Sequence, residues 1–338
     1  MQLGTLLSMT TSGQLAAAAG IARLAPSLYR PCWLAAAGRA GVLTALAEGP
    51  QPLETLAARL EVGPEGRDAL LSWLSVGVSL GELARAGDTW RLRSSLSRRL
   101  AQPEHDPALA ALEELVGLHT RLLLETPARL RERRPFQLAD QDGEVIARSS
   151  RIVEPLIHEA VRATVPAQGA TRLLEVGCGT GTHLRAAAAC NPALTALGLE
   201  LQPEVAAMAR GNLARWGLAD RVRVESGDVR ARPASPEWDL VTLHQNIYYF
   251  PVAERPALLA HVRGFLRPGG RLILTTGCRG GSVAMGVLDL WGAATEGAGR
   301  LPDPDELVAQ LGEAGYMGAA SERLVPGEAL FAFTATKP

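Results

Sequence analysis

Residues 173–183 read "LLEVGCGTGTH" and place three glycines, Gly177, Gly179 and Gly181, at alternate positions. A short apolar run that ends in Glu175 and Val176 comes directly before them. Glycine loses more backbone entropy on folding than any other residue, so this density of glycine is costly inside a packed domain. We therefore expect a ligand to approach the backbone closely at this loop.

The composition indicates a folded globular protein with balanced charge. The chain has 338 residues, enough for two domains, of which 47% are hydrophobic and 20% are charged. The formal net charge is −1, from 34 basic and 35 acidic residues, which gives no electrostatic footprint for nucleic acid or for an anionic membrane. The basic run "RLRERRP" at 129–135 is explained more simply as a solvated helix end. We expect neither a nucleic-acid nor a membrane partner.

The cysteines and the N-terminal residues favour the cytoplasm. Cys32, Cys178, Cys190 and Cys278 form no CxxC pair and show no metal-ligand spacing with histidine, so we expect free thiols and no metal. The apolar residues 1–22 carry no basic residue, and Ser, Thr and Gly interrupt them. This pattern fits neither a signal peptide nor a membrane span.

Residues 1–165 are expected to form a mainly helical domain with a winged-helix order. Three helices are predicted within 35–48, 52–60 and 63–80, and 81–96 predict a two-stranded wing that turns at Ala86-Gly87-Asp88. A winged helix can bind DNA, but the third helix has Arg67 as its one basic residue and is otherwise apolar. Its apolar residues Leu70, Leu71, Trp73 and Leu74 favour a protein interface. A further helix is predicted at 107–132, and 146–156 are expected to form a linker helix.

Residues 166–338 are expected to form a second domain in which strands alternate with helices. Strands are predicted at 172–176, 194–200, 221–225, 238–244, 271–277 and 329–337. This alternation predicts an α/β fold with a doubly wound parallel sheet. Ligands of such sheets bind beyond the carboxyl ends of the strands, which is where the glycine loop lies.

Two carboxylates narrow the class of ligand. The loop is G-x-G-x-G, unlike the G-x-G-x-x-G that fits a pyrophosphate. Glu200 ends the next strand, 19 positions beyond Gly181, where it can accept both hydroxyls of a ribose. Asp228 follows the third strand, where its carboxylate can accept a hydrogen bond from the amino group of adenine.

These motifs resemble the class I S-adenosylmethionine-dependent methyltransferases, whose sheet is Rossmann-like and seven-stranded. "FLRPGGRLIL" at 265–274 is similar to that family's next motif, with a turn at Pro268-Gly269-Gly270. The resemblance implies S-adenosyl-L-methionine as the cofactor. It also implies that Glu175 orders the methionine end of this cofactor and that Leu201 and Val229 flank the adenine ring.

From about residue 27 the chain resembles one branch, the small-molecule O-methyltransferases with an N-terminal winged-helix dimerisation domain. This resemblance implies a homodimer through the N-terminal domain and a small-molecule methyl acceptor. It also implies an acceptor pocket covered by 281–291 and by the linker helix at 146–156.

One departure from the branch concerns the catalytic base. Tyr248 stands where the family has a catalytic histidine, and Tyr249 and Phe250 replace the Asp-Trp pair that follows. A tyrosine is mostly protonated at neutral pH and is therefore a poor general base. His244 is interpreted first as a cofactor-side residue, then as a structural histidine and last as a displaced base. Asn246 and Tyr248 are expected to position the nucleophile by hydrogen bonds.

The sequence leaves the acceptor open between O-, N-, S- and C-nucleophiles. The expected function is methyl transfer to a small molecule, because methyl transfer from a sulfonium mainly requires alignment and exclusion of water. The alternatives are methylation of a peptide or protein group, a DNA-binding regulator whose sheet senses a small molecule, and a relative that binds the cofactor without transferring methyl.

Overall fold

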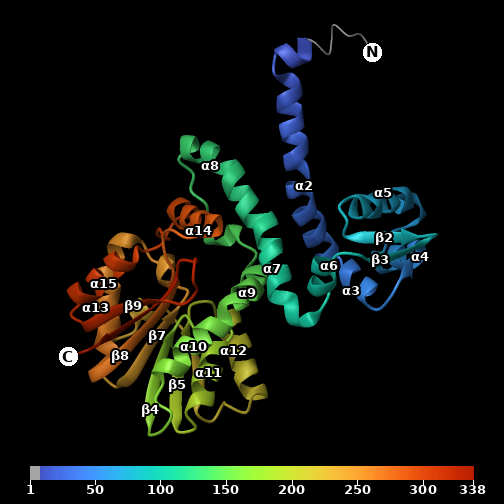
Figure 1. The fold of residues 1–338 in the computed structure, drawn as a ribbon. Helices are drawn as coiled ribbons and strands as arrows, with labels where there is room; N and C mark the ends of the chain where they lie inside the picture. The colour runs from blue at the N-terminus through green and yellow to red at the C-terminus, as the bar shows by residue number, and fades with distance from the viewer. Residues whose placement is uncertain (1–7) are drawn as a thin grey trace. The chain divides into compact units, whose positions relative to one another are not determined.

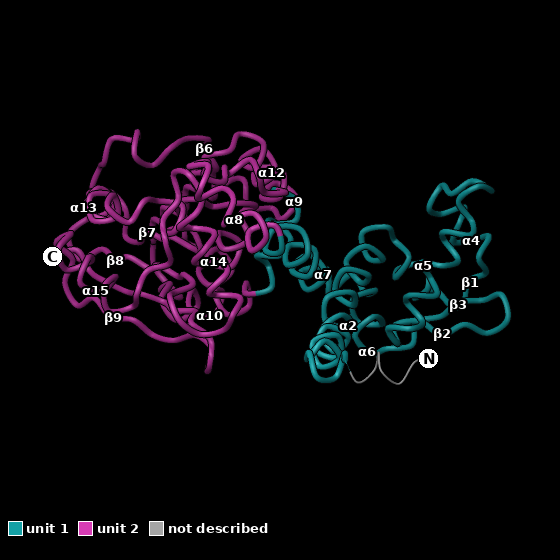
Figure 2. The backbone as a smooth tube through the Cα atoms, turned by 90° about the horizontal axis from the view of Figure 1, so that it is seen from above, with its two compact units in different colours: residues 1–120, 143–152 teal, residues 121–142, 153–338 magenta. Residues whose placement is uncertain are grey.

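The computed structural model describes residues 8–338, which form two compact units (Figures 1 and 2). Within the described residues the first unit comprises 8–120 and 143–152, and the second comprises 121–142 and 153–338. Residues 1–7 lie outside the described part of the chain; they belong to the segment 1–22 that was predicted to be neither a signal peptide nor a membrane span. The predicted domain boundary at residue 165 would place helix α10 (Glu154–Thr164) in the first domain. In the structure this helix belongs to the second compact unit, together with the sheet.

The first unit has the predicted winged-helix order. The predicted second and third helices correspond to α4 and α5, and the predicted wing is the antiparallel pair β2–β3, to which β1 adds a short third strand. The helices and strands of this unit are α2 (Gln14–Arg39), α3 (Val42–Ala47), β1 (Gln51–Pro52), α4 (Leu53–Arg59), α5 (Arg67–Ser79), β2 (Leu83–Ala86), β3 (Thr89–Leu92), α6 (Ser95–Leu100), α7 (Asp106–Glu114) and α9 (Gly143–Ser149).

Two helix predictions need correction. Residues 35–48 are not one helix, because Gly41 has a φ of +73° and caps α3 after α2 has ended. Residues 146–156 are not one linker helix either: α9 is followed by a 3-10 turn at Ser150–Val153 and then by α10. Pro155 lies in the first turn of α10, where its missing N–H costs nothing, and it cannot lie inside a longer helix without a broken hydrogen bond.

The apolar face of α5 packs within its own unit. Leu70 and Leu74 are buried in the core of the winged helix, and Leu71 and Trp73 pack against that core. The Trp33 indole stacks on Trp73 at 5.1 Å and donates to its carbonyl. Leu70 and Leu74 are therefore core residues rather than interface residues, whereas the expected interface role of the partly buried Leu71 and Trp73 stays a prediction.

The second unit is a seven-stranded sheet in the order β6-β5-β4-β7-β8-β10-β9. Strands β4 to β8 are parallel, and β10 runs antiparallel between β8 and β9, which confirms the predicted doubly wound fold. The bounds are β4 (Thr171–Val176), β5 (Leu194–Glu200), β6 (Val222–Ser226), β7 (Trp238–His244), β8 (Leu266–Gly277), β9 (Met317–Arg323) and β10 (Leu330–Thr336).

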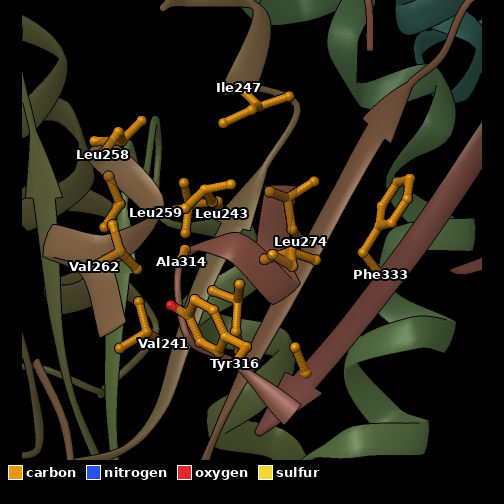
Figure 3. Packing of buried hydrophobic residues seen from close by; sticks show 14 of the residues in the cluster. Val241, Leu243, Ile247, Leu258, Leu259, Val262, Leu274, Ala314, Tyr316 and Phe333 are labelled. Atoms are coloured by element: carbon orange, nitrogen blue, oxygen red, sulfur yellow. The ribbon is translucent and has the colours of Figure 1, made fainter. Parts of the chain in front are cut away.

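Helices cover both faces of this sheet because its buried strands are apolar on both sides. Leu173 packs with α10, α11 (Thr182–Cys190) and α12 (Pro203–Arg215), whereas its neighbour Leu174 packs on the opposite face with α13 (Arg255–Phe265) and α15 (Pro304–Glu313). Figure 3 shows the second cluster, in which side chains of α13 lie beside those of β7, and side chains of β8 and β10 continue the same cluster. The chain order reverses between β4 and β7, so the ligand crevice of such a fold lies at the carboxyl ends of these two strands.

The predicted turn at Pro268-Gly269-Gly270 lies within β8. Trp238 pairs with Leu266, and Leu240 pairs with Arg271. The Pro-Gly-Gly segment between these two pairs is therefore an irregularity inside the strand and not its end. Two further helices lie within the described residues, α8 (Thr120–Glu132) and α14 (Val283–Ala294). Among residues 8–338, no helix is both long enough and apolar enough to cross a bilayer.

Candidate active site

The glycine loop leaves β4 in a conformation that other residues rarely adopt. Gly177, Gly179 and Gly181 have φ values of +67°, +52° and +85°, and Gly181 caps the N-terminus of α11. A Cβ added to Gly179 would meet no atom within 4 Å, whereas one added to Gly177 would lie 2.6 Å from Nδ2 of Asn246. Gly177 thus makes room for a side chain, and Gly179 leaves its backbone open to a ligand.

Glu200 at the end of β5 contacts this loop directly. Its Oε2 accepts the N–H of Gly179 at 2.9 Å, and its Oε1 accepts the N–H of Gln202 at 3.1 Å. A carboxylate has about four lone-pair sites, so capacity remains for the two hydroxyls of a ribose. Leu201 beside it is 58% exposed and offers an apolar surface next to the carboxylate.

Asp228 follows β6, as predicted, but it is engaged by Arg230. The Arg230 guanidinium lies 2.7 Å from Oδ2 of Asp228, and this hydrogen bond holds the pKa of the carboxyl below its usual range. An adenine amino group would therefore share the carboxylate with Arg230. Val229 is packed in the core, so of the two expected apolar neighbours of adenine only Leu201 has a large exposed side chain.

Glu175 is a buried acid inside the sheet. It lies in β4 between Gly198 of β5 and Thr242 of β7, is 1% exposed, and its Oε1 has no hydrogen-bond partner. Burial, and then the charge of Glu200, raises the pKa of Glu175 well above its usual value. An unpaired polar atom in such a place is expensive, and a ligand with polar groups would satisfy it.

Asn246 joins the ends of β4 and β7. Its Nδ2 donates to the carbonyl oxygen of Val176 at 2.5 Å, and its buried Oδ1 has no hydrogen-bond partner. The structure thus brings Gly177, Glu175 and Asn246 to one edge of the sheet, with two unpaired oxygens beside the glycine loop.

Three histidines form a row behind this edge. His244, the last residue of β7, is buried, and its Nδ1 lies 2.9 Å from the hydroxyl of Thr275. Its ring lies 4.8 Å from that of His183 in α11, which in turn lies 5.3 Å from that of His158 in α10. Burial, followed by the neighbouring histidines, lowers the pKa of His244 well below its usual value, and burial with His158 lowers that of His183 to about 3. These imidazoles are neutral and weakly basic at neutral pH.

Tyr248 lies in a short 3-10 turn, Ile247–Tyr249, beyond β7. Its ring packs with those of Tyr249 at 5.1 Å and Trp291 of α14 at 6.1 Å, and its carbonyl accepts the N–H of Gly299. Tyr248 therefore packs toward α14. Trp291 itself is buried, so the aromatic cluster is partly core.

Comparison with known proteins decides the family. Residues 173–270, which contain the glycine loop, Glu200, Asp228 and Tyr248, match the family described as "Methyltransferase domain". This match shows that the chain carries a methyltransferase domain of the class I S-adenosylmethionine-dependent type. It is 31% identical to demethylspheroidene O-methyltransferase of Cereibacter sphaeroides over 71% of this chain and 65% of that relative, so the match spans just under two thirds of the relative's length.

Solved structures support the fold of this chain. Mitomycin 7-O-methyltransferase superimposes with a TM-score of 0.80 at 18% identity, covering 97% of this chain and 100% of that one. Human N-acetylserotonin methyltransferase, solved in complex with S-adenosylmethionine, superimposes with a TM-score of 0.73 at 20% identity, covering 95% and 97%. Both likenesses extend over the helical unit as well as the sheet.

The structure adds residues to the site that the sequence analysis missed. His158 and His183 join His244 only in three dimensions, and a lone histidine after the glycine loop gives no signal of its own. Gln245 is a non-glycine residue with a φ of +53°, and nothing in its sequence neighbourhood predicts this. Within residues 8–338, no group of three or more His, Cys, Asp or Glu side chains is arranged to hold a metal ion.

Proposed function

We propose that this chain transfers a methyl group from S-adenosylmethionine to a small-molecule acceptor. The observation that carries the proposal is the contact of Glu200 with the N–H of Gly179, because it places a ribose-binding carboxylate against an open glycine backbone. The cofactor supplies a methyl group already activated on a sulfonium. The protein has to align donor and acceptor and to exclude water.

The residues of the site fit this cofactor. In the proposal Glu200 holds the ribose, Leu201 lies against the adenine ring, and Asp228 accepts the adenine amino group. The unpaired oxygens of Glu175 and Asn246 suit the ammonium end of the methionine moiety, which donates hydrogen bonds. His244 is assigned to the cofactor side of the site, and Tyr248 to the acceptor side.

The acceptor is proposed to carry an acidic hydroxyl. Two of the proteins named above, demethylspheroidene O-methyltransferase and mitomycin 7-O-methyltransferase, methylate oxygen on small molecules, according to their names. The site offers no strong base, because the neighbouring imidazoles have lowered pKa values and a tyrosine is protonated at neutral pH. A hydroxyl that ionises readily needs little help from a base.

The helical unit is proposed to form a homodimer, through α2 rather than α5. Ile21 and Leu24 are 68% and 71% exposed, and Leu28 and Tyr29 on the same helix are also exposed. Exposed apolar residues gathered along one helix mark an interaction site. A DNA-binding role is disfavoured, because Arg67, the single basic residue of α5, is paired with Glu54 at 2.5 Å. The free thiols of all four cysteines favour the reducing cytoplasm as the compartment.

Calorimetric titration with S-adenosylhomocysteine tests the cofactor site. Glu200→Ala should weaken binding about tenfold to a hundredfold, since it removes charge-assisted hydrogen bonds. Glu204→Ala, an exposed acid in the first turn of α12, is the matched control and should bind like the unchanged protein. Equal affinity in all three folded proteins would remove Glu200 from the site.

A further inference from the structure

Gln245 combines two costly features at the carboxyl end of β7. Its φ of +53° lies in the left-handed region, which a residue with a side chain adopts only when its surroundings enforce it. The enforcing contact is a hydrogen bond of 2.7 Å from its N–H to the carbonyl oxygen of Thr275 in β8. Such strain concentrates at functional sites, and Gln245 stands between His244 and Asn246.

The orientation of the Gln245 amide is fixed by a backbone donor. The N–H of Gly277 donates to Oε1 of Gln245 at 3.3 Å, so this atom must be the oxygen of the amide. The other end, Nε2, is buried and has no hydrogen-bond partner. Gln245 therefore presents an unpaired N–H donor, whereas Asn246 presents an unpaired oxygen because its Nδ2 is used by Val176.

The two amides are anchored on opposite sides of the site. Asn246 lies against Gly177 of the cofactor loop. The anchor of Gln245 lies beneath α14, because a Cβ on Gly277 would be 3.2 Å from Sδ of Met285 and 3.7 Å from Cδ2 of Leu288. Gln245 is thus anchored on the α14 side of the site, with which Tyr248 also packs through Trp291.

We propose that Gln245 determines the specificity of the acceptor site, by donating from Nε2 to a carbonyl or carboxylate oxygen beside the hydroxyl that is methylated. This inference rests on the proposed function. Binding of such an oxygen satisfies the buried donor, and the unpaired state in its absence disfavours acceptors that lack it. A hydroxyl conjugated to a ketone carbonyl, as in a 2-hydroxyquinone, is also unusually acidic, which matches a site without a strong base.

Two variants separate the donor from the rest of the side chain. Gln245→Glu keeps the size and the oxygen that accepts from Gly277, but it replaces the donor by a second acceptor. Gln245→Met keeps the length and removes both polar atoms. Both retain a Cβ at a position of positive φ, so the backbone strain is the same in each.

The test uses matched pairs of hydroxylated ring compounds, for example 2-hydroxy-1,4-naphthoquinone and 2-naphthol, with S-adenosylmethionine labelled in its methyl group. The unchanged enzyme should prefer the carbonyl-bearing member of a pair. Gln245→Glu should lower kcat/KM for that member by about tenfold to a hundredfold, mainly through KM, and Gln245→Met by about tenfold. In both variants the plain hydroxyarene and the affinity for S-adenosylhomocysteine should change less than about threefold.

Each other outcome overturns the inference. Unchanged discrimination in Gln245→Glu shows that the donor is not used, and weakened S-adenosylhomocysteine binding in both variants assigns Gln245 to the cofactor side. A panel in which no carbonyl-bearing member binds or reacts also overturns it. Binding of S-adenosylhomocysteine to the unchanged protein, measured separately, shows whether the proposed function stands or falls with it.

Discussion

Asn246 lies directly over Gly177, with its Nδ2 2.6 Å from the position that a Cβ on this glycine would occupy. The same Nδ2 donates to the carbonyl oxygen of Val176, so one side chain joins the loop after β4 to the loop after β7. The two strands flank the point at which the order of the sheet reverses. The contact therefore fixes the width of the crevice in which the cofactor is proposed to bind.

Gly177→Ala should disturb this contact and the cofactor site together. The new methyl group must displace Asn246, and a φ of +67° strains any side chain, so we expect a loss of about 1–3 kcal/mol in the free energy of unfolding. Affinity for S-adenosylhomocysteine should fall about tenfold. Denaturant unfolding and calorimetry measure both effects.

Gly179→Ala is the matched control, because a Cβ there meets no atom within 4 Å although its φ is +52°. Gly179→Ala should be destabilised by the backbone strain alone, so its free energy of unfolding should fall by less than that of Gly177→Ala. An equal loss in both variants would mean that the Asn246 contact contributes nothing beyond the strain.

Tyr248→Phe should reduce turnover only about threefold to tenfold. The change keeps the ring against Tyr249 and Trp291 and removes one neutral hydroxyl, whose hydrogen bond is worth about 0.5–1.5 kcal/mol. A base would be worth about a hundredfold or more. Single-turnover rates of methyl transfer to an acceptor that the unchanged enzyme methylates measure the effect.

His244→Ala provides the contrast to Tyr248→Phe. A cofactor-side residue should weaken S-adenosylhomocysteine binding more than it slows the bound complex. A large loss of turnover with intact affinity, at either residue, would identify a dedicated base and contradict the account of the site.

The row of histidines should make the protein less stable in mild acid. An unfolded histidine takes up a proton below about pH 6.5, but folded His183 does so only near its lowered pKa of about 3. Between these values the unfolded state binds more protons, so the free energy of unfolding falls as the pH falls, by at most about 1.4 kcal/mol per pH unit for this residue.

His183→Phe removes this titration while it keeps a ring beside His158 and His244. The free energy of unfolding of the variant should depend less steeply on pH between about 6.5 and 4 than that of the unchanged protein. Parallel curves from denaturant titrations at several pH values would show that His183 protonates as readily folded as unfolded.

Ile21→Asp combined with Leu24→Asp should convert the proposed homodimer into a monomer. A pair of charges in an apolar interface must be desolvated without partners, which association cannot offset. Val283→Asp is the control, because this residue of α14 is also exposed but lies in the other unit. Light scattering at micromolar concentration should give a dimer for the unchanged and control proteins; a monomer for the unchanged protein would refute the interface.

Local patterns predicted the sheet because each strand and loop carries its own signal. The apolar runs that end in Val176, Glu200 and His244 are all strands, and the glycines adopt the left-handed conformations that their spacing indicates. Breaks inside helices were missed where one residue decides them, as Gly41 and Pro155 do.

The finer features of the site depend on contacts between segments that are distant in sequence. Arg230 stands two residues after Asp228, so their pairing could have been predicted from the sequence. The row of His158, His183 and His244 could not, because it forms only where α10, α11 and β7 meet. The apolar face of α5 was assigned to a partner because a sequence does not show that Trp33 and the wing already cover it.

Transfer of an isotopically labelled methyl group tests the central claim most directly. The protein is incubated with small hydroxylated metabolites and S-adenosylmethionine labelled in its methyl group, and the products are analysed by mass spectrometry. We predict products that gain one labelled methyl group on oxygen, with an equal amount of S-adenosylhomocysteine, and about tenfold or more slower formation by Glu200→Ala at limiting cofactor. Absence of any labelled small molecule, from a folded protein that also fails to bind S-adenosylhomocysteine, would contradict the account.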